Sequence, residues 1–401
     1  MKKSRIAVLA DQFINWGGGI DYIRLIINGI DTLNRNNGDF KIEFLVFIPQ
    51  KSKFWLLIKN RVKVSLNLFR KHKLSIYPVI NNKFLLKAFE SSEKNNILFY
   101  HTNKNLYDLL KKHQIDIILP TFNPFPNEFP ISWVGYIYDF QHKYFPNFFT
   151  KDEIERRDKH FQSIVDQTKT ILVNSNSVKN DIFKYLELKN HTRIITLPFC
   201  PFYDENLVRF EVDISNYKLP PKYFLISNQF WKHKNHITAI VAFKYFLDNE
   251  GLNDFGLVFT GQTHDERFPD YFNEIKEKIT ELNLNKYIFI LGYISKSDQI
   301  QILKNAVAVI QPTLFEGGPG GGSVYESVAY GIRSIVSDIP VNLEIIDETV
   351  TFFEHSNPHD LSKKMSFVYN QPKFLYTNNK LKQRNNIRLV EMGEQLLKAL
   401  D

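Results

Sequence analysis

The sequence lacks the features that mark secreted, disulfide-bonded and membrane-spanning proteins. Cys200 is its only cysteine, so an intrachain disulfide is excluded. No apolar run approaches the ~20 residues that a bilayer-spanning helix needs. The first apolar stretch, RIAVLAD, is short and is followed by polar residues and glycines, so we expect no secretory signal peptide. These absences predict a cytoplasmic protein.

Several signatures of nucleotide and metal binding are also missing. There is no P-loop GxxxxGK[ST], and the first glycine turn lacks the spacing of the dinucleotide fingerprint GxGxxG. No Asp-x-Asp pair stands in a position to hold a metal ion in a cleft. His233 and His236 could form a ligand pair, but no cysteine or carboxylate cluster accompanies them. We therefore expect a function that needs no bound metal.

The composition is that of an ordinary globular protein with one strongly basic segment. At 401 residues, with 43% hydrophobic and 23% charged residues, the chain is long enough for two domains. Residues 51–112 contain 14 Lys plus Arg against three acidic residues. The resulting charge of this segment, +11, exceeds the net charge of +8 of the whole chain. Two interpretations of this segment have equal support. It could contact an anionic membrane surface or a polyanion, or form the solvated basic face of a helix packed on the first domain.

The hydrophobic pattern alternates between short apolar runs and stretches with helical periodicity. Strands are predicted at residues 5–10, 42–48, 115–120, 133–138, 170–174, 223–227, 256–260, 288–291, 306–311 and 334–337. Helices are predicted at residues 154–165, 177–186, 236–249, 269–282, 296–305 and 323–330. Such alternation is typical of an α/β fold with parallel sheets that helices cover on both faces.

The helical period is lost over residues 197–213, and we place a domain boundary there. Residues 1–203 and residues 204–378 are predicted to form two Rossmann-like domains that face each other across a cleft. Residues 379–401 resemble a polar amphipathic helix that could pack back on the first domain. Ligands of doubly wound sheets bind at the carboxyl ends of the strands.

A glycine-crowded loop follows one of these strand ends. Five of the six residues from Gly317 to Gly322 are glycine, which lets a ligand approach the backbone and its N–H groups closely. Glu316 precedes the glycines and could accept hydrogen bonds from vicinal hydroxyls, or be an exposed loop carboxylate. Glu326 could accept from a ribose diol. However, Ser323 and Glu326 also match an S-x-x-E capping box, and the two interpretations are nearly equal.

Two further strand ends carry candidate residues. In ISNQFWKHKNHITAI, Lys232 and Lys234 lie between a strand and a helix start, where cations and N–H groups suit a pyrophosphate; a solvated loop is the alternative. Asp139 and His142 follow the strand at 133–138, where they could orient or deprotonate a hydroxyl nucleophile. The alternative for this pair is a structural hydrogen bond.

Together these motifs resemble the retaining family 4 glycosyltransferases of the GT-B fold, over nearly the whole chain. The most specific part is P-T-x-x-E-G…E…G-I-x-S-I-V-S-D-I-P, which is similar to the family's donor-site signature. The resemblance implies that Glu316 contacts the donor sugar and that Glu326 holds the nucleotide ribose. It also places the intervening residues near the sugar and phosphates: Gly317, Gly318, Gly321, Gly322 and Ser323.

The resemblance extends to other segments, with departures. The turn with Gly18 and Gly19 looks like the family's G-G-x-E opening, and Tyr138–Asp139 falls where many members carry His–Asp. ISNQFWKHKNH is similar to the phosphate-binding turn, but the usual Arg is Gln229, which leaves the lysines to balance the diphosphate. Glu316 and Glu326 have nine residues between them, whereas the family usually has seven.

What the resemblance implies is transfer of a hexose-type sugar from a nucleoside diphosphate sugar to a hydroxyl acceptor, with retention and without a metal. Glu316, Asp139, His142 and Lys234 would carry the chemistry. The acceptor would be a saccharide or lipid-linked saccharide of surface polysaccharide or lipopolysaccharide assembly, reached by peripheral contact of residues 51–112 with a membrane. The alternatives are a catalytically silent or epimerase-type relative and a basic nucleic-acid-binding protein, which would leave Glu316 and the glycines unused.

Overall fold

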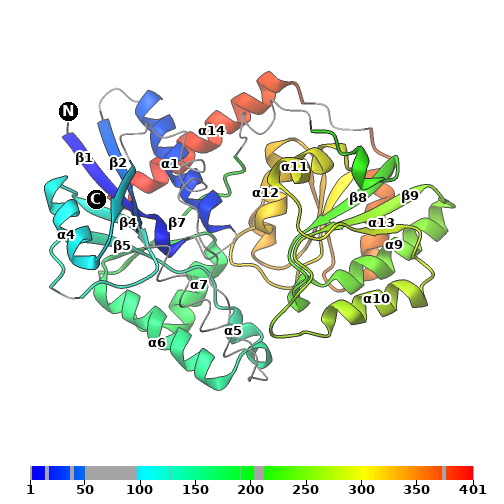
Figure 1. Ribbon diagram of the computed structural model, residues 1–401, viewed down its shortest axis with the longest axis horizontal. Coiled ribbons are helices and arrows are strands. Elements are labelled where there is room, and N and C mark those ends of the chain that lie inside the picture. Colours follow the sequence, from blue (N-terminus) through cyan, green and yellow to red (C-terminus); the bar gives the residue numbers. More distant parts are fainter. Residues whose placement is uncertain are drawn as a thin grey trace.

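A computed structural model of the protein describes residues 2–13, 18–36, 40–49, 97–126, 128–189, 191–202, 212–372 and 376–400. In these residues the chain forms two α/β halves that lie side by side, with one long C-terminal helix spanning both (Figure 1). The expected basic helix within residues 51–70, and most of the basic segment, lie outside the described residues.

The first half contains a parallel seven-stranded sheet of order β3-β2-β1-β4-β5-β6-β7. Its strands are β1 (Lys2–Leu9), β2 (Phe40–Pro49), β3 (Ile97–Tyr100), β4 (Ile117–Thr121), β5 (Ser132–Tyr136), β6 (Thr170–Val173) and β7 (Arg193–Thr196). Its helices are α1 (Gly19–Asn36), α4 (Asn103–Lys112), α5 (Gln141–Tyr144), α6 (Lys151–Gln167) and α7 (Asn176–Tyr185), with short 3-10 turns η1 (Ala10–Gln12) and η3 (Pro146–Phe148). Consecutive side chains of β1, from Ile6 to Val8, are fully buried, as in a sheet covered on both faces.

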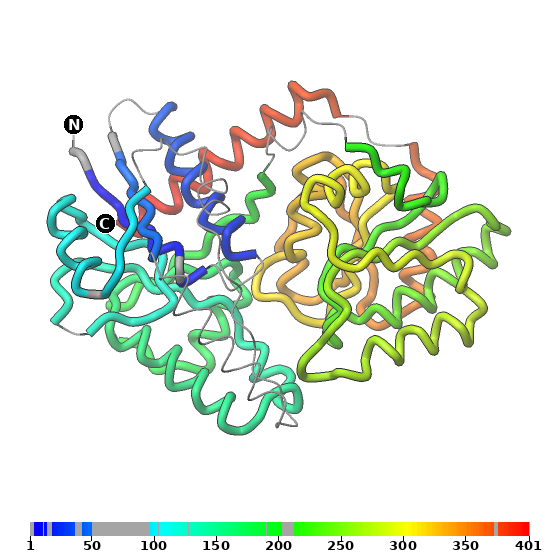
Figure 2. Tube along the Cα trace, in the orientation of Figure 1, coloured from blue at the N-terminus to red at the C-terminus, as the bar shows by residue number. Residues whose placement is uncertain are grey.

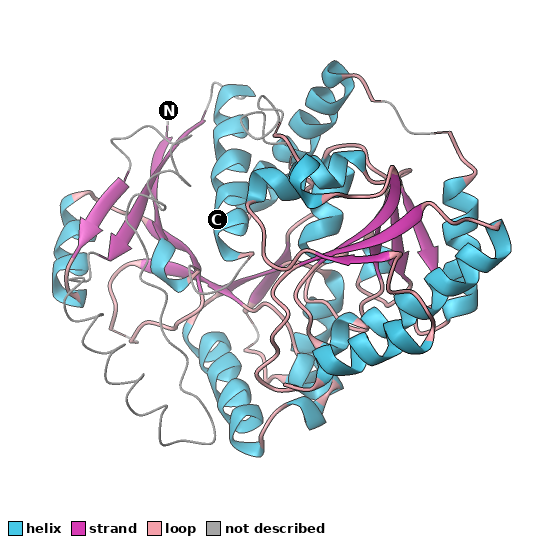
Figure 3. Ribbon diagram, turned by 45° about the vertical axis from the view of Figure 1, so that its right-hand side comes forward, coloured by secondary structure: helices cyan, strands magenta, loops and turns pink. Residues whose placement is uncertain are grey.

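The second half repeats this architecture with a parallel six-stranded sheet of order β10-β9-β8-β11-β12-β13. Its strands are β8 (Lys222–Ser227), β9 (Phe255–Thr260), β10 (Ile288–Ile290), β11 (Ala308–Gln311), β12 (Ser334–Ser337) and β13 (Val350–Phe353). Its helices are α9 (His236–Glu250), α10 (Tyr271–Glu281), α11 (Lys296–Asn305), α12 (Gly321–Ala329) and α13 (Pro358–Tyr369), with 3-10 turns η4 (Ser215–Tyr217), η5 (Lys232–Lys234) and η6 (Asn342–Glu344). Helices flank both faces of this sheet (Figure 3).

The predicted pair of doubly wound sheets is therefore confirmed. The strand at 334–337 and the helix at 296–305 have the predicted bounds. The sequence analysis missed β3, β7 and β13, which lie at sheet edges and are only partly buried. Edge strands of four residues contribute too short an apolar run to stand out from the loops around them.

The C-terminal helix α14 (Asn378–Leu397) returns from the second half to pack on α1 (Figure 2). Leu389, Met392 and Leu396 join the apolar core of the first half. The two helices meet at a pair of glycines: a Cβ on Gly393 would lie 2.6 Å from the carbonyl oxygen of Gly29. Because only glycine permits this approach, larger residues at either position would push α14 off α1.

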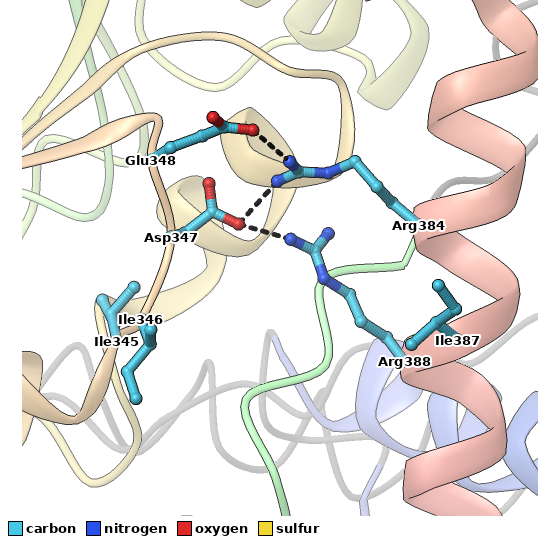
Figure 4. Close-up of a pocket in the computed structure, with 7 residues that line it drawn as sticks. All are labelled: Ile345, Ile346, Asp347, Glu348, Arg384, Ile387 and Arg388. Atoms are coloured by element: carbon cyan, nitrogen blue, oxygen red, sulfur yellow. Dashed lines mark hydrogen bonds and ion pairs between the residues drawn. The ribbon is translucent and has the colours of Figure 1, made fainter.

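Ion pairs of Arg384 and Arg388 connect α14 to the second half. Arg384 and Arg388 both donate to Oδ2 of Asp347, at 2.6 and 2.5 Å, and Arg384 also reaches Glu348 at 3.0 Å (Figure 4). The Asp347 side chain is only 4% exposed, so its charge needs these guanidinium partners. With three isoleucines these residues line a cavity of about 600 Å³, which contains none of the predicted site residues. The helix thereby links the two halves. No helix in the described parts of the chain is both long and apolar enough to cross a membrane.

Candidate functional site

The candidate site lies where the strand order of the second sheet reverses. From β8 the chain continues outward through β9 and β10, whereas β11, on the other side of β8, leads to β12 and β13. The carboxyl ends of the two strands on either side of such a reversal form a crevice that binds ligands. Across it the side-chain amide of Asn228, just after β8, donates to Oε1 of Gln311, the last residue of β11, at 2.9 Å.

An ion pair stands at the mouth of this crevice. The Lys234 ammonium group contacts Oε1 of Glu316, and the Gln311 amide donates to the same oxygen at 2.9 Å. The side chains of Lys234 and Glu316 are 10% and 12% exposed, which leaves part of each accessible. The structure thus brings together a cation and a carboxylate that are 82 residues apart in sequence.

A chain of hydrogen bonds runs from the core to Glu316. The His236 ring nitrogen Nε2 lies 2.7 Å from the side-chain oxygen Oδ1 of Asn228. Because this oxygen can only accept, Nε2 must carry the proton and donate. Asn228 donates to Gln311, and Gln311 donates to Glu316. Every donor in the chain points toward the carboxylate, which holds it in one orientation. The sequence analysis named His236 only as a weak metal-ligand candidate and missed Asn228 and Gln311, whose one signal is that each is a polar residue at a strand end.

Burial keeps His236 neutral. Its ring is inaccessible to solvent and stacks on Phe230 with ring centroids 4.6 Å apart. Desolvation, assisted by the nearby Lys234 charge, lowers the pKa of His236 to about 3. Burial likewise lowers the pKa of His233 well below its ordinary value. Neutral rings can serve as fixed hydrogen-bonding groups without adding charge beside Lys234.

We expect His236 to make the protein sensitive to acid. With a pKa of about 3 in the folded chain and about 6.5 in the unfolded chain, the unfolded state binds one more proton between these values, so stability is lost as pH falls below about 6.5. His236→Gln keeps a donor for Asn228 but cannot titrate. It should lower the slope of unfolding free energy against pH by about 1.4 kcal/mol per pH unit between pH 4 and 6. Urea unfolding at a series of pH values measures this slope.

The matched control for that measurement is His264→Gln, since His264 is exposed in a loop of the same half. A slope in His236→Gln equal to that of the parent protein would contradict the assignment of a buried, neutral imidazole.

The glycine loop ends in a helix that begins earlier than predicted. α12 starts at Gly321, with Gly320 as its N-cap residue in the left-handed region at φ 71°. Ser323 lies inside the first turn, and its hydroxyl has no hydrogen-bond partner among the described residues. The capping-box interpretation of Ser323 and Glu326 is therefore wrong. The N–H groups of the first turn remain available to an anion beside Glu316.

Two glycines of the loop are required by close approach. A Cβ on Gly321 would lie 3.2 Å from the Glu316 carboxyl carbon, and its φ of 66° is left-handed. A Cβ on Gly317 would lie 2.1 Å from the carbonyl oxygen of Tyr138 and 3.0 Å from Cβ of Asp139. Gly317 thus lets the loop of the second half touch the end of β5 in the first half. The predicted donor loop and the predicted Asp139 meet directly.

Glu326 is held by neighbours on α11 rather than by its own helix end. One carboxylate oxygen contacts the Lys296 ammonium group, and the other accepts from the Gln299 amide at 3.1 Å. Lys296 also lies 3.7 Å from Asp21 on α1 of the first half. Two ionised oxygens offer about four acceptor positions, so Glu326 retains capacity for hydroxyl groups of a ligand.

In the first half, Asp139 and His142 have different surroundings. Asp139 Oδ1 accepts from Arg157 on α6 at 2.9 Å and from the Gln141 backbone at 3.0 Å. His142 lies 1% exposed in the core and pairs with Asp158 at 2.9 Å; burial lowers the pKa of its ring. The structure therefore brings Asp139, and not His142, to the glycine loop. Arg157 was missed by the sequence analysis.

The remaining predicted residues surround this centre at some distance from the Lys234–Glu316 pair. Lys232 turns toward Glu274, 3.9 Å away, and covers the ring of Phe268. Gln229 is half-buried, and its side chain has no hydrogen-bond partner in the described ranges. Gly18 and Gly19 open α1, which carries Asp21 to Lys296. A Cβ on Gly318 would lie 3.2 Å from Cβ of Asn174, whereas a Cβ on Gly322 would point into open space.

A carboxylate of the second half fastens the two halves together beside the site. Glu344 accepts from the backbone N–H groups of Asn176 and Ser177 at the start of α7, at 2.7 and 2.8 Å. The Ser177 hydroxyl adds a third bond at 2.7 Å. Close by, the Ser175 hydroxyl donates to the Gly317 carbonyl at 3.1 Å. A negative charge at a helix N-terminus is stabilising, so these contacts hold the glycine loop against the first half. Within the described residues no group of three or more metal-ligating side chains occurs.

Comparison with known proteins finds a family match in the second half. Residues 209–388 match the family described as Glycosyl transferases group 1. This region contains Lys234, Glu316 and Glu326, and the match supports glycosyl transfer as the activity. No curated protein matches the chain.

Solved structures resemble the whole chain. A glycosyltransferase from Rickettsia africae is 17% identical, with a TM-score of 0.60 and coverage of 100% of this chain and 98% of its own. HepE from Anabaena, in complex with UDP, is 12% identical with a TM-score of 0.60 and 99% coverage of both chains. The lipopolysaccharide outer core galactosyltransferase WaaB is 15% identical with a TM-score of 0.55 and 99% coverage of both. The predicted GT-B fold is confirmed.

Proposed function

We propose that the protein transfers a hexose-type sugar from a nucleoside diphosphate sugar to a hydroxyl acceptor, with retention at the anomeric carbon. The observation that carries the proposal is the Lys234–Glu316 pair at the N-terminus of α12, in contact with the first half through Gly317. The family match of residues 209–388 supports the reaction class, and the UDP complex of HepE is consistent with a nucleotide donor.

The leaving diphosphate is the group that Lys234 suits. As the bond between the anomeric carbon and the diphosphate oxygen breaks, the electron pair goes to that oxygen and negative charge develops there. An ammonium group has three donors, so Lys234 can keep its contact with Glu316 while it donates to phosphate oxygens. The first-turn N–H groups of α12 add fixed dipoles aimed at the same charge. The acceptor oxygen bonds to the anomeric carbon, and its proton passes to the diphosphate.

The carboxylates position the donor and the acceptor. Glu316, fixed by Gln311 and Lys234, accepts hydrogen bonds from hydroxyls of the transferred sugar. Glu326 accepts from the ribose, with Lys296 and Gln299 holding its side chain. Asp139, oriented by Arg157, faces the same loop from the first half and orients the hydroxyl that attacks. His142 supports this region through Asp158 from within the core.

We propose a saccharide or lipid-linked saccharide of a surface polysaccharide or lipopolysaccharide as the acceptor. The similarity to WaaB, a lipopolysaccharide outer core galactosyltransferase, supports this proposal. The basic residues within 51–112, most of which lie outside the described residues, would hold the enzyme at the anionic inner face of a membrane.

A nucleotide screen tests the proposal. Thermal and urea unfolding of the full chain are measured with UDP, GDP and dTDP, and release of the nucleoside diphosphate is then followed from the corresponding sugars with and without saccharide acceptors. One nucleotide, at about 100 times its dissociation constant, should stabilise the fold by roughly 2.7 kcal/mol. Failure of all three to bind, with no release from any sugar donor, would refute the proposed function. Binding without transfer would indicate a catalytically silent relative.

A further inference from the structure

A second cavity lies on the first half, beside the glycine loop. Its volume is about 350 Å³. Five of its lining residues come from one face of α6, because their spacing of three and four residues repeats along a helix. With Tyr138 and Phe149 these are Glu153, Arg156, Arg157, His160 and Phe161. No residue predicted for the donor site lines this cavity.

Two residues of the cavity wall contact the second half. Tyr138, in its wall, is the residue whose carbonyl oxygen would lie 2.1 Å from a Cβ on Gly317. Asp139, next in the chain, pairs with Arg157 in the same wall. From the second half, the Arg267 guanidinium lies 5.2 Å from the Phe149 ring centroid. Tyr138 therefore belongs both to the wall of the cavity and to the contact with the donor loop.

Positive charge predominates on the α6 face. Arg157 is held between the Tyr138 and Phe149 rings, 5.2 and 5.0 Å from their centroids, and its Nε is buried without a hydrogen-bond partner in the described residues. Arg156 is exposed, and the Thr150 backbone hydrogen bond together with the Arg156 charge lowers the pKa of Glu153 in the same wall. Glu153 is already engaged, since it accepts from the Thr150 N–H and hydroxyl at 2.8 and 3.0 Å. Burial lowers the pKa of His160, which leaves a neutral ring to exchange hydrogen bonds.

This combination suits a sugar that carries an anionic group. Planar guanidinium groups bind carboxylates and phosphates with two parallel hydrogen bonds, and aromatic faces provide apolar surface for a ring. A neutral saccharide would use the aromatic faces but not the positive charge of the exposed Arg156 guanidinium group.

We propose that this cavity binds the acceptor, and that the acceptor is a saccharide bearing a phosphate or carboxylate group close to the hydroxyl that receives the transferred sugar. The inference rests on the proposed function, which it extends by naming the acceptor class. The phosphate could belong to a phosphorylated or lipid-diphosphate-linked sugar, and the carboxylate to an acidic sugar. Arg156 supplies an exposed positive charge, and Arg157 fixes the position of the anion relative to Asp139.

The test compares three probe sugars on the full-length protein, with and without UDP. Glucose 1-phosphate, glucuronate and glucose are titrated by calorimetry or saturation-transfer NMR at about 50 mM salt, where charge interactions are weakly screened. At least one anionic sugar should bind about 10-fold more tightly than glucose, because charge-assisted hydrogen bonds add to the ring contacts. Preference for glucose 1-phosphate identifies a phosphate-bearing acceptor, and preference for glucuronate an acidic sugar.

Arg156→Gln should abolish this preference, with binding of glucose unchanged. Lys159→Gln is the matched control, because it removes one positive charge from an exposed position of α6 outside the cavity. Arg157→Lys keeps the charge but loses the planar fork, and should weaken anionic sugars more than glucose. Equal binding of anionic and neutral sugars, or an unchanged preference in Arg156→Gln, would overturn the inference. UDP binding and donor turnover are measured in the same samples, so loss of the proposed function would be recognised separately.

Discussion

Replacing Glu316 with glutamine is expected to lower kcat of sugar transfer by about 100-fold or more. The carboxylate accepts hydrogen bonds with both oxygens, whereas the amide has one acceptor, so the donor sugar loses an anchor at the reacting centre. The substitution also removes the charged partner of Lys234 and leaves one amide oxygen to serve both Lys234 and the Gln311 amide. Steady-state kinetics with the donor found in the nucleotide screen measure the effect.

Stability should fall in the same variant. Removing one member of a buried ion pair costs roughly 3–5 kcal/mol, because the remaining charge lacks a partner. The side chains of Glu316 and Lys234 keep 12% and 10% exposure, so we expect a value near the lower end of that range. Kinetics are therefore measured well below the melting temperature of the variant, with the folded fraction checked by circular dichroism.

Glu277→Gln is the matched control, since this glutamate is exposed on α10 of the same half. Its kinetics and stability should equal those of the parent protein. Full transfer activity and unchanged donor affinity in Glu316→Gln would show that the donor site has been placed wrongly.

Lys234→Met is expected to lower kcat by about 100- to 1,000-fold. Removing one preorganised group that stabilises the charge of a transition state has an effect of this size. Methionine approximates the length of lysine and keeps the apolar packing of its stem, but it cannot neutralise the diphosphate. Affinity for the free nucleoside diphosphate should fall too, because Lys234 contacts Glu316 beside the first residue of α12. Kinetics and calorimetric titration of UDP, or of the nucleotide found to bind, measure both effects.

The double variant Lys234→Met, Glu316→Gln separates stability from catalysis. Each single substitution leaves one buried charge without its partner, whereas the double substitution removes both charges. The double variant should therefore recover much of the lost unfolding free energy. Activity should stay as low as in the worse single variant, since both groups act on the same donor. Recovered activity in the double variant would mean that the pair serves only to stabilise the fold.

The fold could be derived from the sequence to a large extent. Apolar strands in a parallel sheet are buried on both faces, which makes the central strands, such as the one at 334–337, visible as continuous apolar runs. The glycines from 317 to 322 and the carboxylate before them could also be recognised in the sequence, because a backbone that is closely approached requires glycine. Partly buried edge strands such as β3 carry no comparable signal.

The candidate site was predicted as a set of residues but not as an arrangement. The sequence matched Ser323 and Glu326 to a capping box at the start of a helix. The position of Gly320 in the left-handed region starts α12 two residues earlier, and the Glu326 side chain contacts Lys296 instead. Asp139 and His142 looked alike in the sequence. The packing of α6 then directed Asp139 to Arg157 and the glycine loop, and enclosed His142 in the core.

By itself, the sequence determined the two doubly wound halves and the glycine loop behind Glu316, because periodicity and residue type are local properties. Only the tertiary structure decided that Lys234, rather than Lys232, pairs with Glu316, that His236, Asn228 and Gln311 hold this carboxylate, and that Gly317 meets the first half at Tyr138. These contacts join residues far apart in the chain. They depend on sheet order and on the direction of individual side chains, which no local pattern encodes.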